Sequence, residues 1–188
     1  MKKEIITIAG APGSGKSSTA DLVAKELGFK RFSSGDFMRK IALESNLSLN
    51  ELSIEAEKDR TIDDKIDDEV KKMAEKDKIV LDSRLAFHFI PNSFKVFLDL
   101  PPEIAKDRIA HNLKINTLRQ QSEHSTTPEE IYQKIIERLA SEKKRYMELY
   151  GIDHTNKNNY DLVINTNKNN LQEVVAIILS EYKNWIEK

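Results

Sequence analysis

The stretch EIITIAGAPGSGKS, residues 4–17, decides the fold of this chain. Residues 4–9 are β-branched and nearly all apolar, which is typical of a short strand buried on both faces. Three glycines follow, at positions 10, 13 and 15, and a helical pattern runs from there to Leu27, with Gly28 as its stop signal. A strand, a glycine-rich turn and a helix in this order predict the start of a parallel sheet covered by helices.

The turn in this stretch has the composition of a loop that binds phosphate groups. It shows the full pattern of glycine, four residues, glycine, lysine and serine. Its glycines let backbone N–H groups surround a phosphate, while Lys16 is predicted to reach the β- and γ-phosphates and Ser17 to bind Mg²⁺. The alternative, a chance glycine turn, does not account for the strand before it and the helix after it. The predicted ATP-binding residues here are Gly10, Ala11, Pro12, Gly13, Ser14, Gly15, Lys16, Ser17 and Ser18.

The composition of the 188 residues limits the classes of protein that remain. With 39% hydrophobic and 32% charged residues, the chain is too apolar for a disordered protein. Its net charge of −1 gives no overall field that attracts nucleic acid or an anionic membrane, and the lack of cysteine excludes thiol catalysis and disulfides. No apolar run approaches the ~20 residues that span a bilayer. Since no signal-peptide pattern is present either, a cytoplasmic protein is expected.

The rest of the chain alternates strands and helices. Further strands are predicted at 29–33, 78–82, 94–98 and 161–164. Helix starts are predicted at Ser34, Ser48, Thr61, Pro101, Thr127 and Leu171. This alternation predicts an α/β fold with a five-stranded parallel sheet flanked by helices, and the phosphate loop after its first strand makes this the P-loop NTPase fold. Residues 1–188 are expected to form a single domain.

Further polar residues are expected at the carboxyl edge of this sheet. Asp82 ends a buried strand, where a carboxylate that orders Mg²⁺ through water would lie, although a helix cap or turn former is the alternative. Arg39 lies in the first turns of a helix, and Arg84 lies in the loop over the cleft. Arg138 and Arg145 are seven residues apart, so both are predicted on one helix face, for which solvated, salt-bridged charge is the alternative. Only eight of the thirty basic residues are arginines, whose planar fork lysine cannot imitate.

Together these motifs resemble the nucleoside monophosphate kinases, and most closely the cytidylate kinases of the compact, archaeal type. Residues 33–39, SSGDFMR, are similar to the STGDMLR of adenylate kinases. Residues 82–84, DSR, are similar to the DGR of bacterial cytidylate kinases. The seven-residue spacing of the two arginines on the long helix also matches cytidylate kinases, as do residues 137–153 and 160–166.

The resemblance implies an enzyme that moves the γ-phosphate of ATP to CMP, and to dCMP, with Mg²⁺ as cofactor. The alternatives are an adenylate kinase or another small-molecule kinase of this fold, and a nucleotide-dependent switch or assembly ATPase. Arg108 would lie beside the adenine of ATP. The implied catalytic residues are Lys16, Arg84, Arg138 and Arg145, and the implied acceptor-binding residues are Ser34, Arg39, Asp63, Arg84 and Arg138.

Two segments around the cleft complete this expectation. Residues 35–77 would bind the acceptor, and residues 108–145 would form a lid that contains a polar loop at 112–126 and Arg119. Because Leu85 replaces an aspartate that touches the acceptor ribose in bacterial cytidylate kinases, Asp59, Asp63 and Asp67 are candidates to read the base or ribose. A solvated acidic helix face is the alternative for these three. The expected partners are nucleotides, with no nucleic acid and no membrane, and a monomer is expected.

Overall fold

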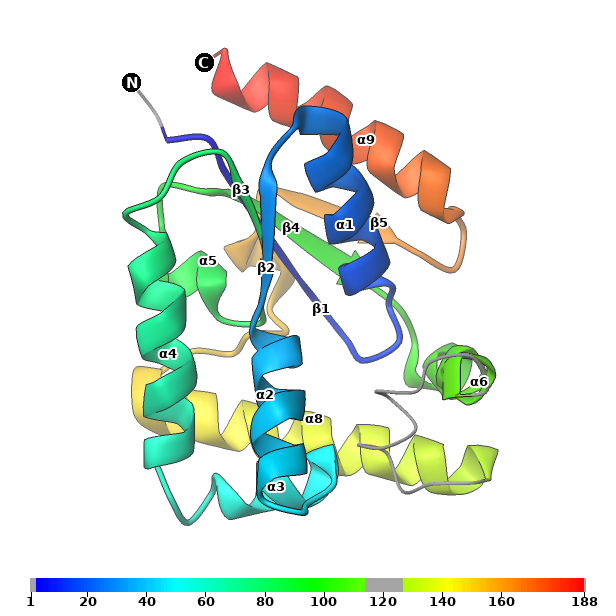
Figure 1. The fold of residues 1–188 in the computed structure, drawn as a ribbon. Coiled ribbons are helices and arrows are strands. Elements are labelled where there is room, and N and C mark those ends of the chain that lie inside the picture. The colour runs from blue at the N-terminus through cyan, green and yellow to red at the C-terminus, as the bar shows by residue number, and fades with distance from the viewer. Residues whose placement is uncertain (1–2, 114–126, 188) are drawn as a thin grey trace.

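The computed structural model describes residues 3–113 and 127–187 (Figure 1). Within this part of the chain, five strands form one parallel sheet in the order β2-β3-β1-β4-β5. The strands are β1 (Ile5–Gly10), β2 (Lys30–Ser33), β3 (Ile79–Asp82), β4 (Phe94–Asp99) and β5 (Leu162–Asn165). The predicted sheet is confirmed, with every strand end within one residue of its predicted position. Strand β1 lies at the centre, so the loop after it opens at the middle of the carboxyl edge.

A helix lies in every connection between successive strands. The helices are α1 (Lys16–Leu27), α2 (Ser34–Glu44), α3 (Leu49–Glu55), α4 (Thr61–Met73), α5 (Ala86–Phe89), α6 (Pro102–Leu113), α8 (Pro128–Tyr150) and α9 (Leu171–Ile186), with a 3₁₀ turn, η1, at Lys157–Asn159. The predicted capping boxes that begin at Ser48 and Thr127 start α3 and α8. Gly28 and Gly151 end α1 and α8 in the left-handed conformation. No helix in the described ranges is long and apolar enough to cross a membrane.

One predicted helix start needs correction. Helix α2 is capped by Ser33 and not by Ser34, because Ser33 is still extended and its hydroxyl accepts the N–H of Asp36. Helix α4 starts at Thr61 as predicted, and the Thr61 N–H donates to the Asp59 carboxylate at 2.9 Å. Helix α5 and η1 were not predicted, because four and three residues are too few to show a helical period.

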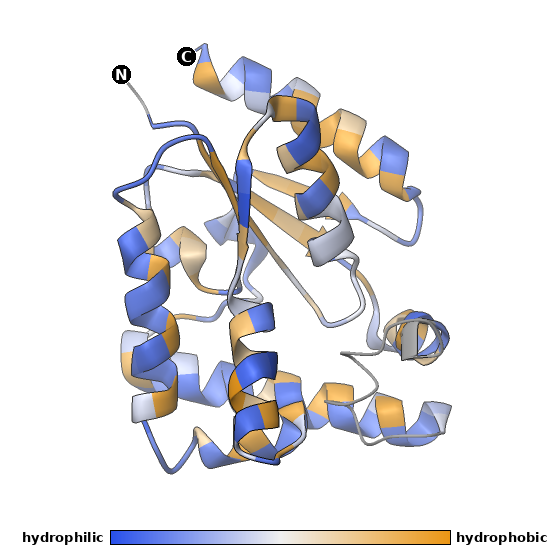
Figure 2. Cartoon of the chain, in the orientation of Figure 1, coloured by the Kyte–Doolittle hydropathy of each residue, from blue (hydrophilic) through white to orange (hydrophobic). Residues whose placement is uncertain are grey.

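The sheet is buried on both faces. Ile6 and Ile8 point to the face covered by α1 and α9, while Ile5 points to the face covered by α4 and α5. All six residues of β1 are buried, as expected for a strand between two helical layers. Figure 2 shows the apolar strands between helices whose outward faces are hydrophilic.

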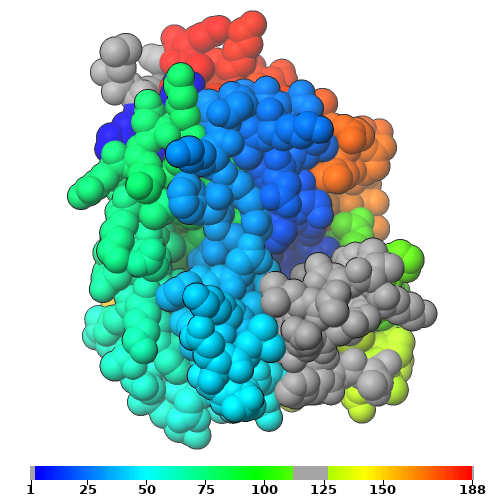
Figure 3. Space-filling view, viewed as in Figure 1, coloured from blue at the N-terminus to red at the C-terminus, as the bar shows by residue number. Residues whose placement is uncertain are grey.

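Helix α8 lies below the carboxyl edge of the sheet and joins the two sides of the molecule at that edge (Figure 1). At its N-terminal half, Ile131 and Ile135 pack against α6. Further along, α8 contacts α3, which belongs with α2 and α4 to the helical segment at 35–77. In the space-filling view, this segment forms the left and lower part of the face shown (Figure 3). The loop after β1, the segment at 35–77 and α8 therefore surround one region.

Gly10, the last residue of β1, can be used to test how closely the backbone packs where the strand enters its loop. Its φ is +144°, and an added Cβ would lie 2.3 Å from the Leu98 carbonyl oxygen. We expect Gly10→Ala to lower the free energy of unfolding by at least about 2 kcal/mol, because backbone strain and a backbone clash add. Gly35→Ala is the matched control, since its Cβ would meet nothing closer than 3.6 Å and alanine favours a helix. Urea denaturation of both variants measures the difference, and equal effects would contradict this account.

Candidate active site

The loop after β1 wraps around the N-terminus of α1. Gly13 and Gly15 adopt φ values of +73° and +88°, which turn the backbone in a way that L side chains resist. Lys16 Nζ donates hydrogen bonds to the carbonyl oxygens of Gly10, at 2.8 Å, and Ala11, at 2.7 Å. Burial, together with the nearby Arg84 guanidinium, lowers the pKa of Lys16 to about 7. The ammonium group is thus held across the loop where phosphate groups were predicted to bind.

Asp82, at the end of β3, faces Ser17 at the start of α1. The Ser17 hydroxyl donates to Asp82 Oδ2 at 2.7 Å, and Asp82 itself is buried. A hydroxyl beside a carboxylate suits Mg²⁺, which binds protein oxygens sparingly and keeps water and phosphate ligands. No group of three or more His, Asp or Glu residues that could hold a metal occurs in the described part of the chain. A metal at Ser17 and Asp82 would therefore complete its shell with phosphate and water oxygens.

A cleft of about 320 Å³ brings most of the predicted site residues together. It extends from the phosphate loop to the start of α2 and to the loop after β3. The predicted residues on its walls are Pro12, Gly13, Gly15, Lys16, Ser17, Ser18, Ser34, Arg39, Asp82, Arg84 and Arg138. Asp21, Arg31 and Asp36 also line it, and the sequence analysis gave them no role. One end of the cleft is thus the phosphate loop, and arginines from four other parts of the chain line the same cleft.

A fully buried carboxylate, Glu142 on α8, holds two of these arginines. Glu142 is 0% exposed, and its oxygens lie 2.6 Å from Arg84 Nε and 3.0 Å from Arg138 Nε. Desolvation raises the pKa of Glu142, but the two guanidinium groups outweigh it and lower that pKa to about 2. Because Arg84 and Arg138 share one carboxylate, their side chains are fixed side by side on the cleft wall.

His154 is packed beside this ion-pair cluster. Its Nε2 lies 3.9 Å from Glu142 Oε2, and its side chain is almost fully buried. Burial lowers the pKa of His154 to about 4, against the opposing effect of Glu142. The imidazole is therefore neutral at pH 7 and adds no charge to the cluster.

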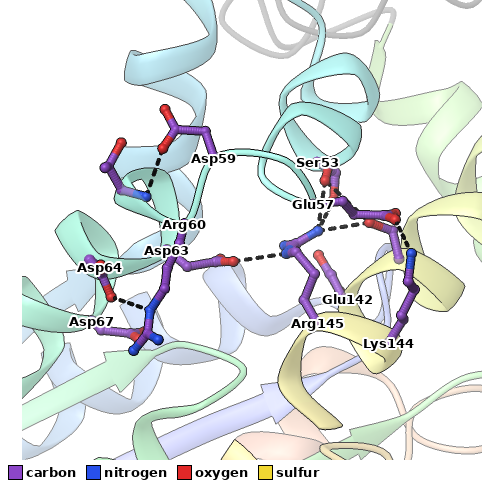
Figure 4. Close-up of polar contacts among 12 residues, drawn as sticks. Ser53, Glu57, Asp59, Arg60, Asp63, Asp64, Asp67, Glu142, Lys144 and Arg145 are labelled. Atoms are coloured by element: carbon purple, nitrogen blue, oxygen red, sulfur yellow. Dashed lines mark hydrogen bonds and ion pairs between the residues drawn. The ribbon is translucent and has the colours of Figure 1, made fainter. Parts of the chain in front are cut away.

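Arg145 does not line this cleft, and its predicted contact with the transferred phosphoryl group stays a prediction. Its Nε donates to Asp63 Oδ2 at 2.9 Å, and its terminal nitrogen Nη1 donates to the Ser53 carbonyl and the Ser141 hydroxyl, both at 2.7 Å (Figure 4). The side chains of Arg145 and Asp63 are only 3% and 5% exposed. Seven residues advance a helix by roughly 10 Å, so Arg138 reaches the cleft while Arg145 lies beyond its end. Arg145 instead ties α8 to α3 and α4.

The acidic residues of the segment at 35–77 are engaged within the protein. Asp63 is paired with Arg145, and the Tyr150 hydroxyl donates to Asp67. Both aspartates are buried, so the alternative of a solvated face does not hold for them, while contact with an acceptor base stays a prediction. Burial is the main reason that the pKa of Asp67 is raised to about 6 and that of Asp63 is raised. Asp59 is exposed and bonds the first turn of α4.

Two further expectations concern α6 and the lid. Arg108 donates to the Thr166 carbonyl at 2.6 Å, which holds its side chain against the end of β5. Contact of Arg108 with adenine stays a prediction. Residues 112 and 113 belong to α6 and not to a loop. The rest of the predicted polar loop, including Arg119, lies outside the described residues.

Sequence reasoning missed Arg31, Asp36 and Glu142. Glu142 was noticed between Arg138 and Arg145 but was given no role. Arg31 carried one usable signal, since it is among the few arginines of a lysine-rich chain and lies two residues before the SSGDFMR motif. The carboxylates that Arg31 contacts belong to three other elements, so only the fold shows that they surround it.

The fold and this cleft identify the class to which the protein belongs, the small P-loop kinases. A shikimate kinase from Bacteroides thetaiotaomicron has the same fold, with a TM-score of 0.61 at 14% identity over 98% of this chain and 99% of that one. In sequence, residues 5–168 match the model of the cytidylate kinase-like family. The chain belongs to the cytidylate kinase-like family, as its motifs predicted.

Two archaeal relatives resemble the chain over nearly their whole length. The cytidylate kinase of Archaeoglobus fulgidus is 38% identical over 178 residues, which cover 93% of this chain and 92% of the relative. The cytidylate kinase of Methanosphaera stadtmanae is 34% identical over 177 residues, with 93% and 95% covered. The predicted likeness to compact archaeal enzymes is therefore confirmed.

The Glu142 cluster can be tested by removing its negative charge. We expect Glu142→Gln to lower the free energy of unfolding by about 3–5 kcal/mol, because Arg84 and Arg138 would stay buried without a counter-charge. Glu57→Gln is the matched control, since Glu57 pairs with Lys144 at 2.7 Å on the surface and should matter by less than about 1 kcal/mol. Denaturant titration of both variants decides, and a Glu142 variant as stable as the control would refute the role given to this carboxylate.

Asp67 gives a prediction for the dependence of stability on pH. Its folded pKa of about 6 exceeds its ordinary 3.8, so between these values the folded protein binds more protons than the unfolded chain. Asp67 therefore makes the protein less stable as pH rises from about 4 to 6. We expect Asp67→Asn to raise the free energy of unfolding at pH 7 by about 1–3 kcal/mol and to flatten this decline. Melting curves from pH 4 to 8 measure it, with exposed Asp68→Asn as the control; identical profiles would contradict the prediction.

Proposed function

We propose that this protein transfers the γ-phosphate of ATP to the phosphate of CMP, and of dCMP, to give ADP and CDP or dCDP. One observation carries the proposal: the phosphate loop faces a second group of phosphate-binding side chains, Arg39, Arg84 and Arg138, in the same cleft. A nucleotide-dependent switch has no second phosphate to hold. The choice of CMP follows from the family and from relatives named cytidylate kinase.

On the donor side, the loop after β1 binds the phosphates of ATP. Its backbone N–H groups and Lys16 hold the β- and γ-phosphates. Ser17 would hold Mg²⁺, with Asp82 ordering it through water, and the ion would neutralise charge on these phosphates. Arg108, on α6, would lie beside the adenine.

On the acceptor side, arginine forks hold the monophosphate. Arg39 and Arg84 grip its oxygens through paired N–H groups, and Ser34, at the start of α2, lines the same cleft. Arg138 faces the space between donor and acceptor and shares the charge of the group in transfer. Phosphoryl transfer depends mainly on alignment and charge stabilisation, so these residues suffice without a general base.

The acceptor base needs a site of its own, because Asp63 and Asp67 are engaged elsewhere. A pocket of about 200 Å³ between α2 and α4 shares Ser34 with the cleft. Its walls include Phe32, Phe37, Val70 and Met73. We place the pyrimidine ring in this mainly apolar pocket, where aromatic side chains can stack on it. Glu69 at the pocket can accept a hydrogen bond from the amino group that cytosine carries and uracil lacks.

The proposal is tested by a coupled assay with ATP, Mg²⁺ and one acceptor at a time. We expect fast turnover with CMP, slower turnover with dCMP, and weak activity with UMP, AMP and GMP. Faster turnover with AMP or GMP than with CMP would show that the proposed acceptor is wrong and that a purine monophosphate is the substrate. ATP hydrolysis that does not depend on any acceptor would refute the kinase function.

Arg39 tests the acceptor site directly. We expect Arg39→Lys to raise the KM for CMP roughly ten- to hundred-fold while the KM for ATP changes little, because lysine cannot bind two phosphate oxygens through a planar fork. Arg60→Lys is the matched control, since Arg60 is an exposed arginine on the same segment that pairs with Asp64 at 3.2 Å. Steady-state kinetics with each substrate varied in turn measure the effect. An unchanged KM for CMP, or equal losses for both substrates, would contradict the assignment.

A further inference from the structure

Arg31, on strand β2, contacts carboxylates from three other elements at the edge of the cleft. Its Nε lies 3.3 Å from Asp21 on α1, its Nη1 lies 2.8 Å from Asp36 on α2, and its Nη2 lies 3.4 Å from Asp82 at the end of β3. The Arg31 side chain is 21% exposed and lines the cleft. All three guanidinium nitrogens therefore have a carboxylate oxygen within 3.4 Å, which a lysine at this position could not reproduce.

Two of these carboxylates also contact residues on opposite sides of the cleft. Asp82 accepts a hydrogen bond from Ser17, which belongs to the donor and metal side. The second oxygen of Asp36 is paired with Arg39, which belongs to the acceptor side. The contacts thus run without a break from Ser17 through Asp82, Arg31 and Asp36 to Arg39.

We propose that Arg31 is a positioning residue that couples the metal and nucleotide side of the cleft to the acceptor side. This inference rests on the function proposed above, because it assigns those two sides to ATP and CMP. Asp36 divides its charge between Arg31 and Arg39, so Arg39 can turn to a phosphate without leaving Asp36 unpaired. The same guanidinium holds a positive charge beside Asp82, which moderates the attraction of that carboxylate for Mg²⁺.

Replacing Arg31 by glutamine should weaken the binding of CMP and lower the Mg²⁺ concentration that ATP binding requires. We expect Arg31→Gln to raise the dissociation constant of CMP about tenfold. Asp36 would then have Arg39 as its remaining arginine partner, and the CMP phosphate would have to compete with Asp36 for Arg39. The Mg²⁺ concentration that half-saturates ATP binding should fall roughly three- to fivefold, because a positive charge next to Asp82 is gone. Calorimetric titrations of CMP, and of ATP at a series of Mg²⁺ concentrations, measure both without turnover.

Arg31→Lys separates charge from geometry. Lysine keeps the positive charge but cannot reach Asp36 and Asp82 together, so CMP binding should weaken as in Arg31→Gln while the Mg²⁺ response stays near that of the wild type. Arg60→Gln is the control, because it also removes one arginine but from an exposed pair with Asp64. Both of its titrations should match the wild type. Should Arg31→Gln fail to fold, Arg31→Lys alone still tests the geometric half of the proposal.

The outcomes distinguish this inference from the proposed function. Wild-type protein that binds ATP but no pyrimidine monophosphate would overturn both. Wild-type protein that binds CMP, together with Arg31 variants that bind it equally well, would overturn only the coupling. If the variants lose affinity for CMP and ATP by the same factor, with no change in the Mg²⁺ response, Arg31 has only a general structural role. That result would also overturn the coupling.

Discussion

The contact between Glu142 and two guanidinium groups governs how the cleft is built. A carboxylate without solvent contact is strongly unfavourable unless oppositely charged groups surround it, and here Arg84 and Arg138 do so at 2.6 and 3.0 Å. Arg84 comes from the loop after β3, so the contact also fixes α8 below the carboxyl edge of the sheet. Removing either partner leaves a buried charge, which explains why α8, the loop and both arginines must be positioned together.

The same arrangement recurs on the other side of the cleft. Arg39 and Arg31 share Asp36, as Arg84 and Arg138 share Glu142. Arginines that face the cleft are therefore held in place before any nucleotide arrives. Side chains that are already oriented lose little entropy when phosphates bind, and their dipoles need little rearrangement during transfer. A bound phosphate must, in exchange, compete with a carboxylate for the same fork.

The sequence was sufficient for features that depend on neighbours along the chain. The apolar run of β1, the glycines after it and the capping box at Ser48 are local patterns, and this strand, the phosphate loop and α3 followed from them. Asp63 and Arg145 show where local patterns end. Their spacing placed them on helices correctly, but their partners lie about eighty residues away, and only tertiary packing decides that they face each other. Glu142 is similar, because a glutamate on a mixed-charge helix is expected at the surface, and only the tertiary structure shows that it is buried.

The buried pair of Asp63 and Arg145 has a consequence for how sequences of this kind can diverge. Losing one member leaves an uncompensated charge in the interior, whereas replacing both by apolar residues of similar volume is often neutral or stabilising. Substitutions at the two positions are therefore accessible together and costly singly. Ser53 and Ser141 bond the same guanidinium and would be released from that constraint in the same step. Evolutionary drift across the junction of α3, α4 and α8 is thus expected to proceed by joint replacement of both charges, with the arginine on the cleft side of α8 held unchanged.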